Sequence, residues 1–242
     1  MKQALFIALF FIFPLVSIQA QKPEFWDGIE AFDGPTDQNP VLASQLDFYF
    51  DKLVAPLPDS ITMEIDRLAV RTSFNTNLRD FILWHLLEKY RHPEYMSQDQ
   101  VFVYLYDQYF SQLEIKDLNE ANLAMIREKA ERLRRLALFN LAPNFQLNDS
   151  SDIQSVESEF TVLFFHDHDC EVCQQEMRDL DSVVVQHPEI RRVAIDLNTN
   201  DVRVNKLYDL YDIETTPLIY VLDRDKRIIA KKIRAKQIPL VL

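Results

Sequence analysis

The first half of the chain is patterned for helices. Apolar residues recur every three or four positions in five stretches, the spacing that places them on one side of a helix. These stretches are 41–57, 61–70, 73–90, 99–113 and 119–137. The fourth is so rich in apolar and aromatic residues that it must be buried nearly all round or face a partner. The pattern therefore predicts an all-α N-terminal domain of about five helices over residues 41–140.

From Leu141 onward the spacing of the apolar residues changes. Short apolar runs typical of buried strands alternate with amphipathic stretches of helical spacing. The expected strands are 160–165, 191–197, 218–222 and 228–233, and the expected helices are 170–186 and 202–211. The order βαβαββ, which closes on an antiparallel hairpin, is typical of an α/β layer. Residues 141–242 are therefore predicted to form a second domain of the α/β class.

Residues 1–20 have the pattern of a secretory signal peptide. A charged start precedes the apolar run 4–16, and small and polar residues follow it. The alternative is an uncleaved membrane anchor, but 13 apolar residues are fewer than the roughly 20 that cross a bilayer. We expect an exported, periplasmic protein with no stable membrane insertion after signal removal. Residues 21–40 are expected to form an irregular arm that docks through Phe25 and Trp26.

The amino-acid composition and charge exclude several classes of function. The chain has only two glycines, Gly28 and Gly34, so it contains neither a glycine-rich phosphate loop nor a dinucleotide-binding fingerprint. Its formal charge of −12 makes nucleic acid a poor partner, because a polyanion is repelled over most of such a surface. The most basic stretch, 127–135, also contains Glu128 and Glu131 at helical spacing, which is typical of a solvated helix face. We expect no nucleic-acid partner and no cofactor.

Cys170 and Cys173 follow the first buried strand directly, at the point where the next helix begins. Unpaired backbone N–H groups and the helix dipole at such a position favour thiolate over thiol. Cys170 is therefore the predicted nucleophile, and Cys173, one turn later, would resolve the mixed disulfide. Two alternatives stay open. One is a structural disulfide, and the other is a metal site that adds His166 and His168 to the two cysteines.

A second motif, Thr216-Pro217, enters a hydrophobic strand, with its proline 47 residues after Cys170. The two motifs together resemble the thioredoxin superfamily. Residues 142–147 (Ala-Pro-Asn-Phe-Gln-Leu) are similar to the opening of exported TlpA/ResA-type thiol–disulfide oxidoreductases. The resemblance implies an α/β thioredoxin-like C-terminal domain and a cis Pro217 that lies against the cysteine pair. It also implies that Thr216 and Pro217 bind the backbone of the partner.

The resemblance extends to Glu176 and to the helical half. Glu176 is similar to an active-site acid of the TlpA/ResA group, which implies proton exchange with the thiols. The alternative is a surface glutamate in the first turns of the helix. The helical half is similar to an uncharacterised domain that precedes thioredoxin-like domains in exported proteins of Gram-negative bacteria. That family implies no activity.

The sequence also departs from the thioredoxin pattern. Asp169 stands in place of the usual Trp, Glu171-Val172 in place of Gly-Pro, and Lys226 in place of the hairpin Gly. Asp167, Asp169 and Glu171 place negative charge around the thiol, which disfavours the thiolate. The chain leaves little room for the final helix of the fold. We therefore expect an exposed apolar face of the sheet that the helical domain or a partner would cover.

Two functions fit these observations. The first is an exported thiol–disulfide oxidoreductase whose partners are protein thiols or disulfides and a redox partner protein, with a helical domain that sets partner access. The alternative is a non-catalytic binding module, in which the helical domain recognises a protein or a ligand.

Overall fold

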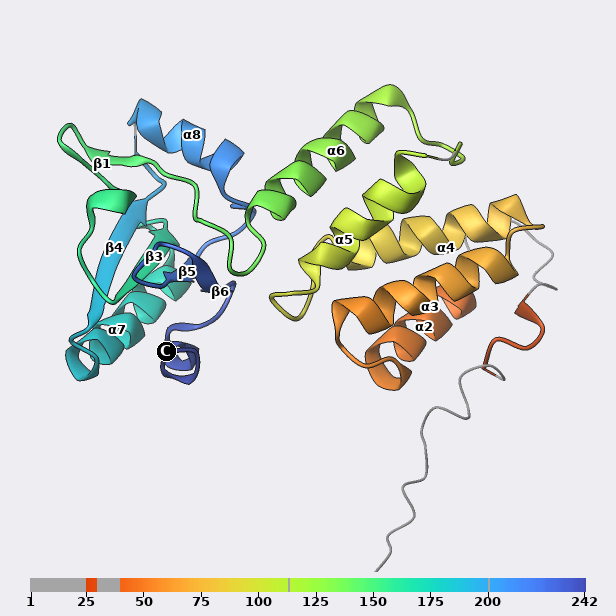
Figure 1. Cartoon of the computed structure of the whole chain (residues 1–242), viewed down its shortest axis with the longest axis horizontal. Coiled ribbons are helices and arrows are strands. Elements are labelled where there is room, and N and C mark those ends of the chain that lie inside the picture. Colours follow the sequence, from red (N-terminus) through yellow and green to blue (C-terminus); the bar gives the residue numbers. More distant parts are fainter. Residues whose placement is uncertain (1–24, 30–39, 113, 200) are drawn as a thin grey trace, which may run out of the picture.

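The computed structural model describes residues 25–29, 40–112, 114–199 and 201–242. A helical part and an α/β part lie side by side (Figure 1). The expected signal peptide and most of the expected irregular arm lie outside the described residues. None of the helices within the described ranges is long and apolar enough to cross a membrane.

The helical part follows the five stretches that the hydrophobic pattern predicts. Its elements are α2 (Pro40–Phe48) with a π-helical turn (Tyr49–Leu53), α3 (Pro58–Arg71), α4 (Thr76–Lys89), α5 (Asp99–Leu105) with a π-helical turn (Tyr106–Phe110), and α6 (Glu120–Arg135). Asn75 and Asn119 cap α4 and α6, because each side chain accepts a hydrogen bond from a backbone N–H of the first turn. These caps explain why both helices begin where they do.

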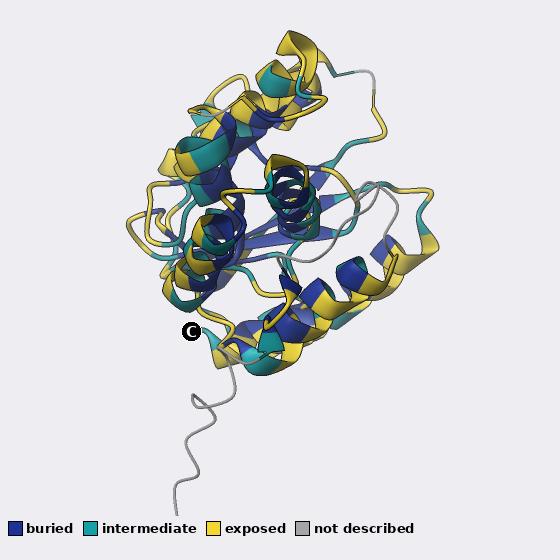
Figure 2. Cartoon of the chain, turned by 90° about the vertical axis from the view of Figure 1, so that its right-hand side faces the viewer, coloured by how far each residue is buried: buried dark blue, intermediate teal, exposed yellow. Residues whose placement is uncertain are grey.

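One apolar cluster holds the helical part together. It takes residues from every helix, including Leu46 (α2), Ile65 (α3), Leu83 (α4), Phe102 (α5) and Leu133 (α6). Trp26 of the N-terminal arm is buried in the same cluster, and the ring of Phe25 packs beside it. Buried positions follow the inward faces of the helices, while exposed positions cover the outside (Figure 2). The composition of the stretch 99–113 is thus explained by burial of α5.

The α/β part contains the predicted βαβαββ order. Its elements are β1 (Gln146–Asn148), β2 (Ser151–Asp152), a 3₁₀ turn (Ile153–Ser155), β3 (Phe160–His166), α7 (Glu171–Gln186), β4 (Ile190–Asp196), α8 (Val202–Leu210), β5 (Leu218–Leu222), β6 (Ile228–Lys231) and a 3₁₀ helix, η7 (Ala235–Leu240). The main sheet has the strand order β4-β3-β5-β6. Strands β3 and β4 are parallel, and β5 and β6 each run antiparallel to their neighbour. The small β1–β2 hairpin was not predicted.

Apolar side chains pack on both faces of the main sheet. On one face, Leu180 and Val183 of α7 cover Val162 and Phe164 of β3. On the other, Val204 and Leu207 of α8 join Leu163 and Phe165 of β3 in a separate cluster. Alternate residues of β3 thus enter opposite clusters, as the two-residue period of a strand requires. The five central residues of the strand are buried between them, and Phe160 and His166 at its ends are half-buried.

The C-terminal segment corrects the expectation of an exposed apolar face. Instead of a final α-helix, the 3₁₀ helix η7 packs against α7, and its Ala235 and Ile238 are fully buried in the α7 cluster. Met96 from the loop before α5 packs against the same cluster. The short η7 segment and Met96 of the helical part therefore pack over the sheet face that carries Ala230.

The two parts meet through apolar and charged contacts. Leu136, at the C-terminal end of α6, is buried in the α8 cluster of the sheet. Lys231 of β6 forms an ion pair with Asp99 of α5, and both side chains are 1% exposed. The ammonium group also donates a hydrogen bond to the carbonyl of Leu136, where the helix dipole favours a positive charge. Burial lowers the pKa of Lys231, against the opposing charge of Asp99.

Candidate active site

The two sequence motifs lie at the same edge of the main sheet. In the β3–β5 ladder Phe165 pairs with Leu218, so the end of β3 lies beside the start of β5. The cysteine loop leaves β3 at that edge, and the Thr216–Pro217 pair enters β5 there. The peptide bond between Thr216 and Pro217 is cis. The sheet register therefore places the two motifs at one edge of the sheet, although Cys170 and Pro217 are 47 positions apart in the chain.

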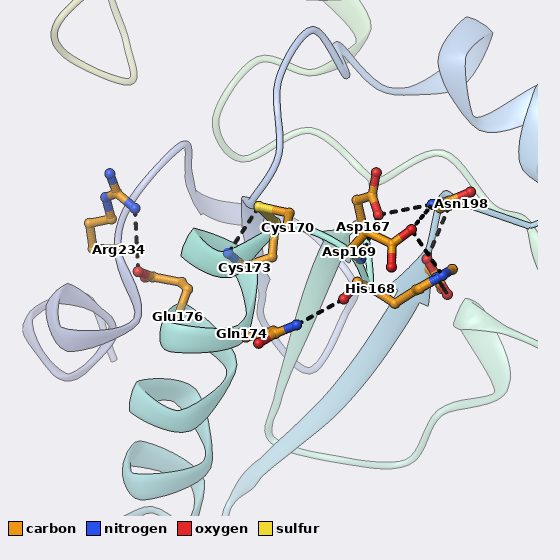
Figure 3. The surroundings of a disulfide bond; sticks show 10 residues. Asp167, His168, Asp169, Cys170, Cys173, Gln174, Glu176, Asn198 and Arg234 are labelled. Atoms are coloured by element: carbon orange, nitrogen blue, oxygen red, sulfur yellow. Dashed lines mark hydrogen bonds and ion pairs between the residues drawn. A yellow bond between two sulfur atoms is a disulfide. The ribbon is translucent and has the colours of Figure 1, made fainter.

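Cys170 and Cys173 form a disulfide with a Cα–Cα distance of 5.2 Å. Cys170 is the N-cap residue of α7, and its Sγ accepts a hydrogen bond from the backbone N–H of Cys173 at 3.1 Å (Figure 3). Cys173 is only 2% exposed, whereas Cys170 is half-buried. After reduction, this N–H group and the positive end of the helix dipole would stabilise a thiolate at Cys170.

A network of hydrogen bonds holds the acidic loop before Cys170. The amide of Asn198 donates to the carboxylate of Asp167 at 3.2 Å and to that of Asp169 at 3.1 Å (Figure 3). Gln174 of α7 donates to the carbonyl of His168 at 3.0 Å. Asn198 follows β4, 28 positions after Cys170, and no local motif marks it in the sequence. Its amide satisfies both acids beside the disulfide without adding a positive charge.

The two histidines that precede the cysteines have separate partners. His168 Nδ1 lies 2.8 Å from Asp196 Oδ2, and this hydrogen bond raises the pKa of His168. The ring of His166 stacks on Phe164 with 5.3 Å between centroids. Among the residues that the structure describes, no group of three or more His, Cys, Asp or Glu side chains is arranged to hold a metal ion.

Glu176 lies one turn after Cys173 on α7, and its side chain is directed away from the disulfide (Figure 3). Its carboxylate accepts a hydrogen bond from the backbone N–H of Ala235 and another from Arg234 at 3.4 Å. Glu176 is 7% exposed. The carboxylate thus anchors η7 to α7, while proton exchange with the thiols stays a prediction.

Glu176 allows a test of these two roles. We expect Glu176→Ala to lower the free energy of unfolding by about 1–3 kcal/mol, because the buried N–H of Ala235 loses its acceptor. Glu176→Gln keeps an acceptor oxygen and should cost less than about 1 kcal/mol. Urea unfolding followed by circular dichroism measures both. If Glu176 exchanges protons with the thiols, the Gln variant will also change the pH dependence of disulfide exchange. An unchanged pH profile would leave only the anchoring role.

An open groove runs from the acidic loop to the cis-proline segment. Its volume is about 420 Å³. The lining residues come from the loop after β3, the loop after β4, α8 and the segment before β5: Asp167, Leu197, Asn198, Tyr208, Ile213, Glu214, Thr215 and Thr216. Because Asp167 and Thr216 line one groove, the loop before Cys170 and the residue before Pro217 face a common space.

The fold is similar to that of a thioredoxin-like protein from Bacteroides caccae. The match has a TM-score of 0.69 at 16% sequence identity and covers 98% of this chain and 97% of that one, so it includes the helical part. No family model and no curated protein sequence matches the chain. The chain therefore has a thioredoxin-like fold preceded by a helical domain, which confirms the predicted fold class.

Two further solved structures match less than half of this chain. A domain of a possible thiol-disulfide isomerase from Cytophaga hutchinsonii is 28% identical, with 43% of this chain and 89% of that chain covered and a TM-score of 0.37. The thioredoxin domain of a thiol-disulfide oxidoreductase from Bacteroides vulgatus is 16% identical, with 44% and 99% covered and a TM-score of 0.36.

Proposed function

We propose that this protein is an exported thiol–disulfide oxidoreductase that exchanges disulfides with protein partners. The observation that carries the proposal is the Cys170–Cys173 disulfide at the N-terminus of α7, at the sheet edge where the cis Thr216–Pro217 bond enters β5. A disulfide that spans three positions closes too short a loop to restrict the unfolded chain strongly. A redox role explains its position better than a stabilising role.

The proposed reaction begins with the reduced protein. The thiolate of Cys170 attacks one sulfur of the partner disulfide, a mixed disulfide forms, and the partner's other sulfur leaves as a thiolate. The thiolate of Cys173 then attacks Cys170 Sγ, which forms the Cys170–Cys173 bond and releases the second partner thiolate. Two electrons pass from the protein to the partner, and the two thiolates take up protons from solvent. The reverse sequence oxidises a partner dithiol.

The exposure of the two sulfurs supports this assignment of roles. Cys173 is 2% exposed, so a folded partner reaches Cys170 first. Thr216 and Pro217 are proposed to bind the backbone of the partner, because Thr216 lines the groove and the pair enters β5 at the same sheet edge as the cysteine loop. Export to the periplasm is proposed from the signal-peptide pattern of residues 1–20 alone.

The proposal is tested with the purified protein in glutathione and dithiothreitol redox buffers. We expect one reversible two-electron transition, read from the fraction of alkylated cysteines, and catalysed reduction of insulin or of a peptide disulfide. If the wild-type protein shows neither a reversible transition nor catalysed exchange, the proposal is contradicted. A partner that binds equally well when both cysteines are serine would instead favour the non-catalytic binding module.

A further inference from the structure

The helical domain reaches the cis-proline segment through a buried lysine. Lys129 of α6 is 5% exposed at its side chain. Its Nζ donates to Asp212 Oδ1 at 3.1 Å and to Glu214 Oε1 at 2.6 Å. Both acids belong to the segment between α8 and Pro217, more than 80 positions further along the chain. One side chain of the helical domain thus binds two carboxylates of the loop that leads into the candidate active site.

A second residue of the helical domain binds the same loop. His92, between α4 and α5, places its Nδ1 2.9 Å from Glu214 Oε2. The two carboxylate oxygens of Glu214 are therefore engaged by two different residues of the helical domain. Glu214 comes two positions before Thr216 and lines the groove beside it. Because its side chain is still 33% exposed, Glu214 lies at the boundary between the domain contact and the groove.

The buried carboxylate of Asp212 has more than one cationic partner in this contact. Asp212 is completely buried at its side chain and also pairs with Lys232 at 2.7 Å and with Arg132 at 3.9 Å. Burial raises the pKa of Asp212, but the charges of Lys232 and Lys129 outweigh it, so the pKa lies below its usual value. The ring of Phe102 lies 5.9 Å from Lys129 Nζ. A buried ion that is enclosed in this way is costly to separate from its partners, so the contact resists opening.

We propose that the helical domain positions the partner-binding loop of the redox site, with Lys129 and His92 as the positioning residues and Glu214 as the group they hold. This inference rests on the proposed function for its effect on exchange. Neither Lys129 nor His92 contacts the cysteines by any bond that the described residues show; they act through the segment 212–217. The helical domain is thereby a working part of the redox site.

The decisive variant is Glu214→Ala. It removes the contacts that Glu214 makes with Lys129 and His92, while Lys129 keeps Asp212 as a partner, so no unpaired charge is buried. We expect the KM for a peptide disulfide to rise about tenfold, with a smaller change in kcat and an unchanged reduction potential of the cysteine pair. We also expect faster hydrogen exchange at the backbone amides of residues 213–216. Glu214→Gln, which keeps an acceptor oxygen, should fall between the wild type and the Ala variant.

Lys129 gives a second series. Lys129→Met should produce the same rise in KM and the same loss of protection, and Lys129→Arg should restore most of both, because a guanidinium can bind both carboxylates. Two variants serve as controls. Lys236→Met removes an ion pair with Asp179 within the α/β domain, and Asp107→Asn removes an exposed pair with Arg134 within the helical domain. Neither should reproduce the change in KM.

The outcomes separate the two proposals. If the wild-type protein exchanges disulfides but Glu214→Ala changes neither KM nor amide protection, the positioning role is overturned and the proposed function survives. If both controls match the Ala variant, the effect is general loosening and the positioning role is again overturned. If the wild-type protein exchanges no disulfides, the proposed function fails, while hydrogen exchange at residues 213–216 still decides whether Lys129 and His92 hold the loop.

Discussion

Replacing Cys170 with serine is expected to lower the rate of peptide-disulfide reduction by at least roughly 1,000-fold, to the level of the reaction without protein. A serine hydroxyl is not ionised near neutral pH and forms no mixed disulfide with the partner. Cys173→Ser should instead accumulate a mixed disulfide at Cys170, because the resolving sulfur is missing. Stopped assays with alkylation and intact-mass measurement distinguish the two variants.

The serine variant contains its own structural control. Cys170 caps α7 by accepting the backbone N–H of Cys173, and serine is among the best residues for that position. A lost rate in Cys170→Ser with an unchanged circular dichroism spectrum therefore reports chemistry rather than fraying of the helix. Cys170→Ala removes the cap as well, so comparison of the two isolates the contribution of the cap. Undiminished turnover by the serine variant would remove Cys170 from the proposed reaction.

Breaking the buried pair between Lys231 and Asp99 is expected to produce the largest loss of stability. Both side chains are 1% exposed, and they join β6 to α5 across the domain contact. Lys231→Met leaves Asp99 buried without its cation and also removes the hydrogen bond to the carbonyl of Leu136. We expect the free energy of unfolding to fall by about 3–5 kcal/mol. Urea unfolding, followed by far-UV circular dichroism, gives this value.

Two further variants show how much of the loss in Lys231→Met comes from the buried charge. The double variant Lys231→Met with Asp99→Leu should recover much of the loss, since two apolar side chains replace two charges. Asp107→Asn, which breaks an ion pair whose members are 47% and 41% exposed, should cost less than about 1 kcal/mol. If Lys231→Met cost no more than this surface variant, the pair would not join the two domains energetically.

Much of the fold follows from local periodicity. The helices α3, α4 and α6 and the strands β3 and β5 carry regular apolar spacing over at least five residues, and their observed bounds lie close to the predicted ones. The π-helical turns after α2 and α5 could not be predicted, because the apolar spacing continues through them and only the hydrogen-bond pattern changes. The strands β1 and β2 are three and two residues long, too short to establish a period.

The residues of the candidate site likewise fall into those that a sequence motif marks and those that only the folded structure reveals. Cys170 and Pro217 were found because each belongs to a motif placed at the end or the start of an apolar strand. Asn198 and Glu214 could not be found from the sequence, because their roles depend on contacts that only the folded chain makes. Lys129 lies 83 and 85 positions from the two acids that it binds. In the sequence Lys129 appears only as one basic residue of a helix face, with no sign that this position is buried.

The number of cysteines in the chain limits which disulfides can form during folding. Cys170 and Cys173 are the only cysteines, and they pair with each other. Oxidative folding can therefore yield a single intramolecular isomer, so a correct product needs no isomerase to reshuffle mispaired bonds. For the same reason every molecule is either dithiol, bridged, or covalently joined to another thiol compound, and weighing the intact protein identifies which of these states it occupies.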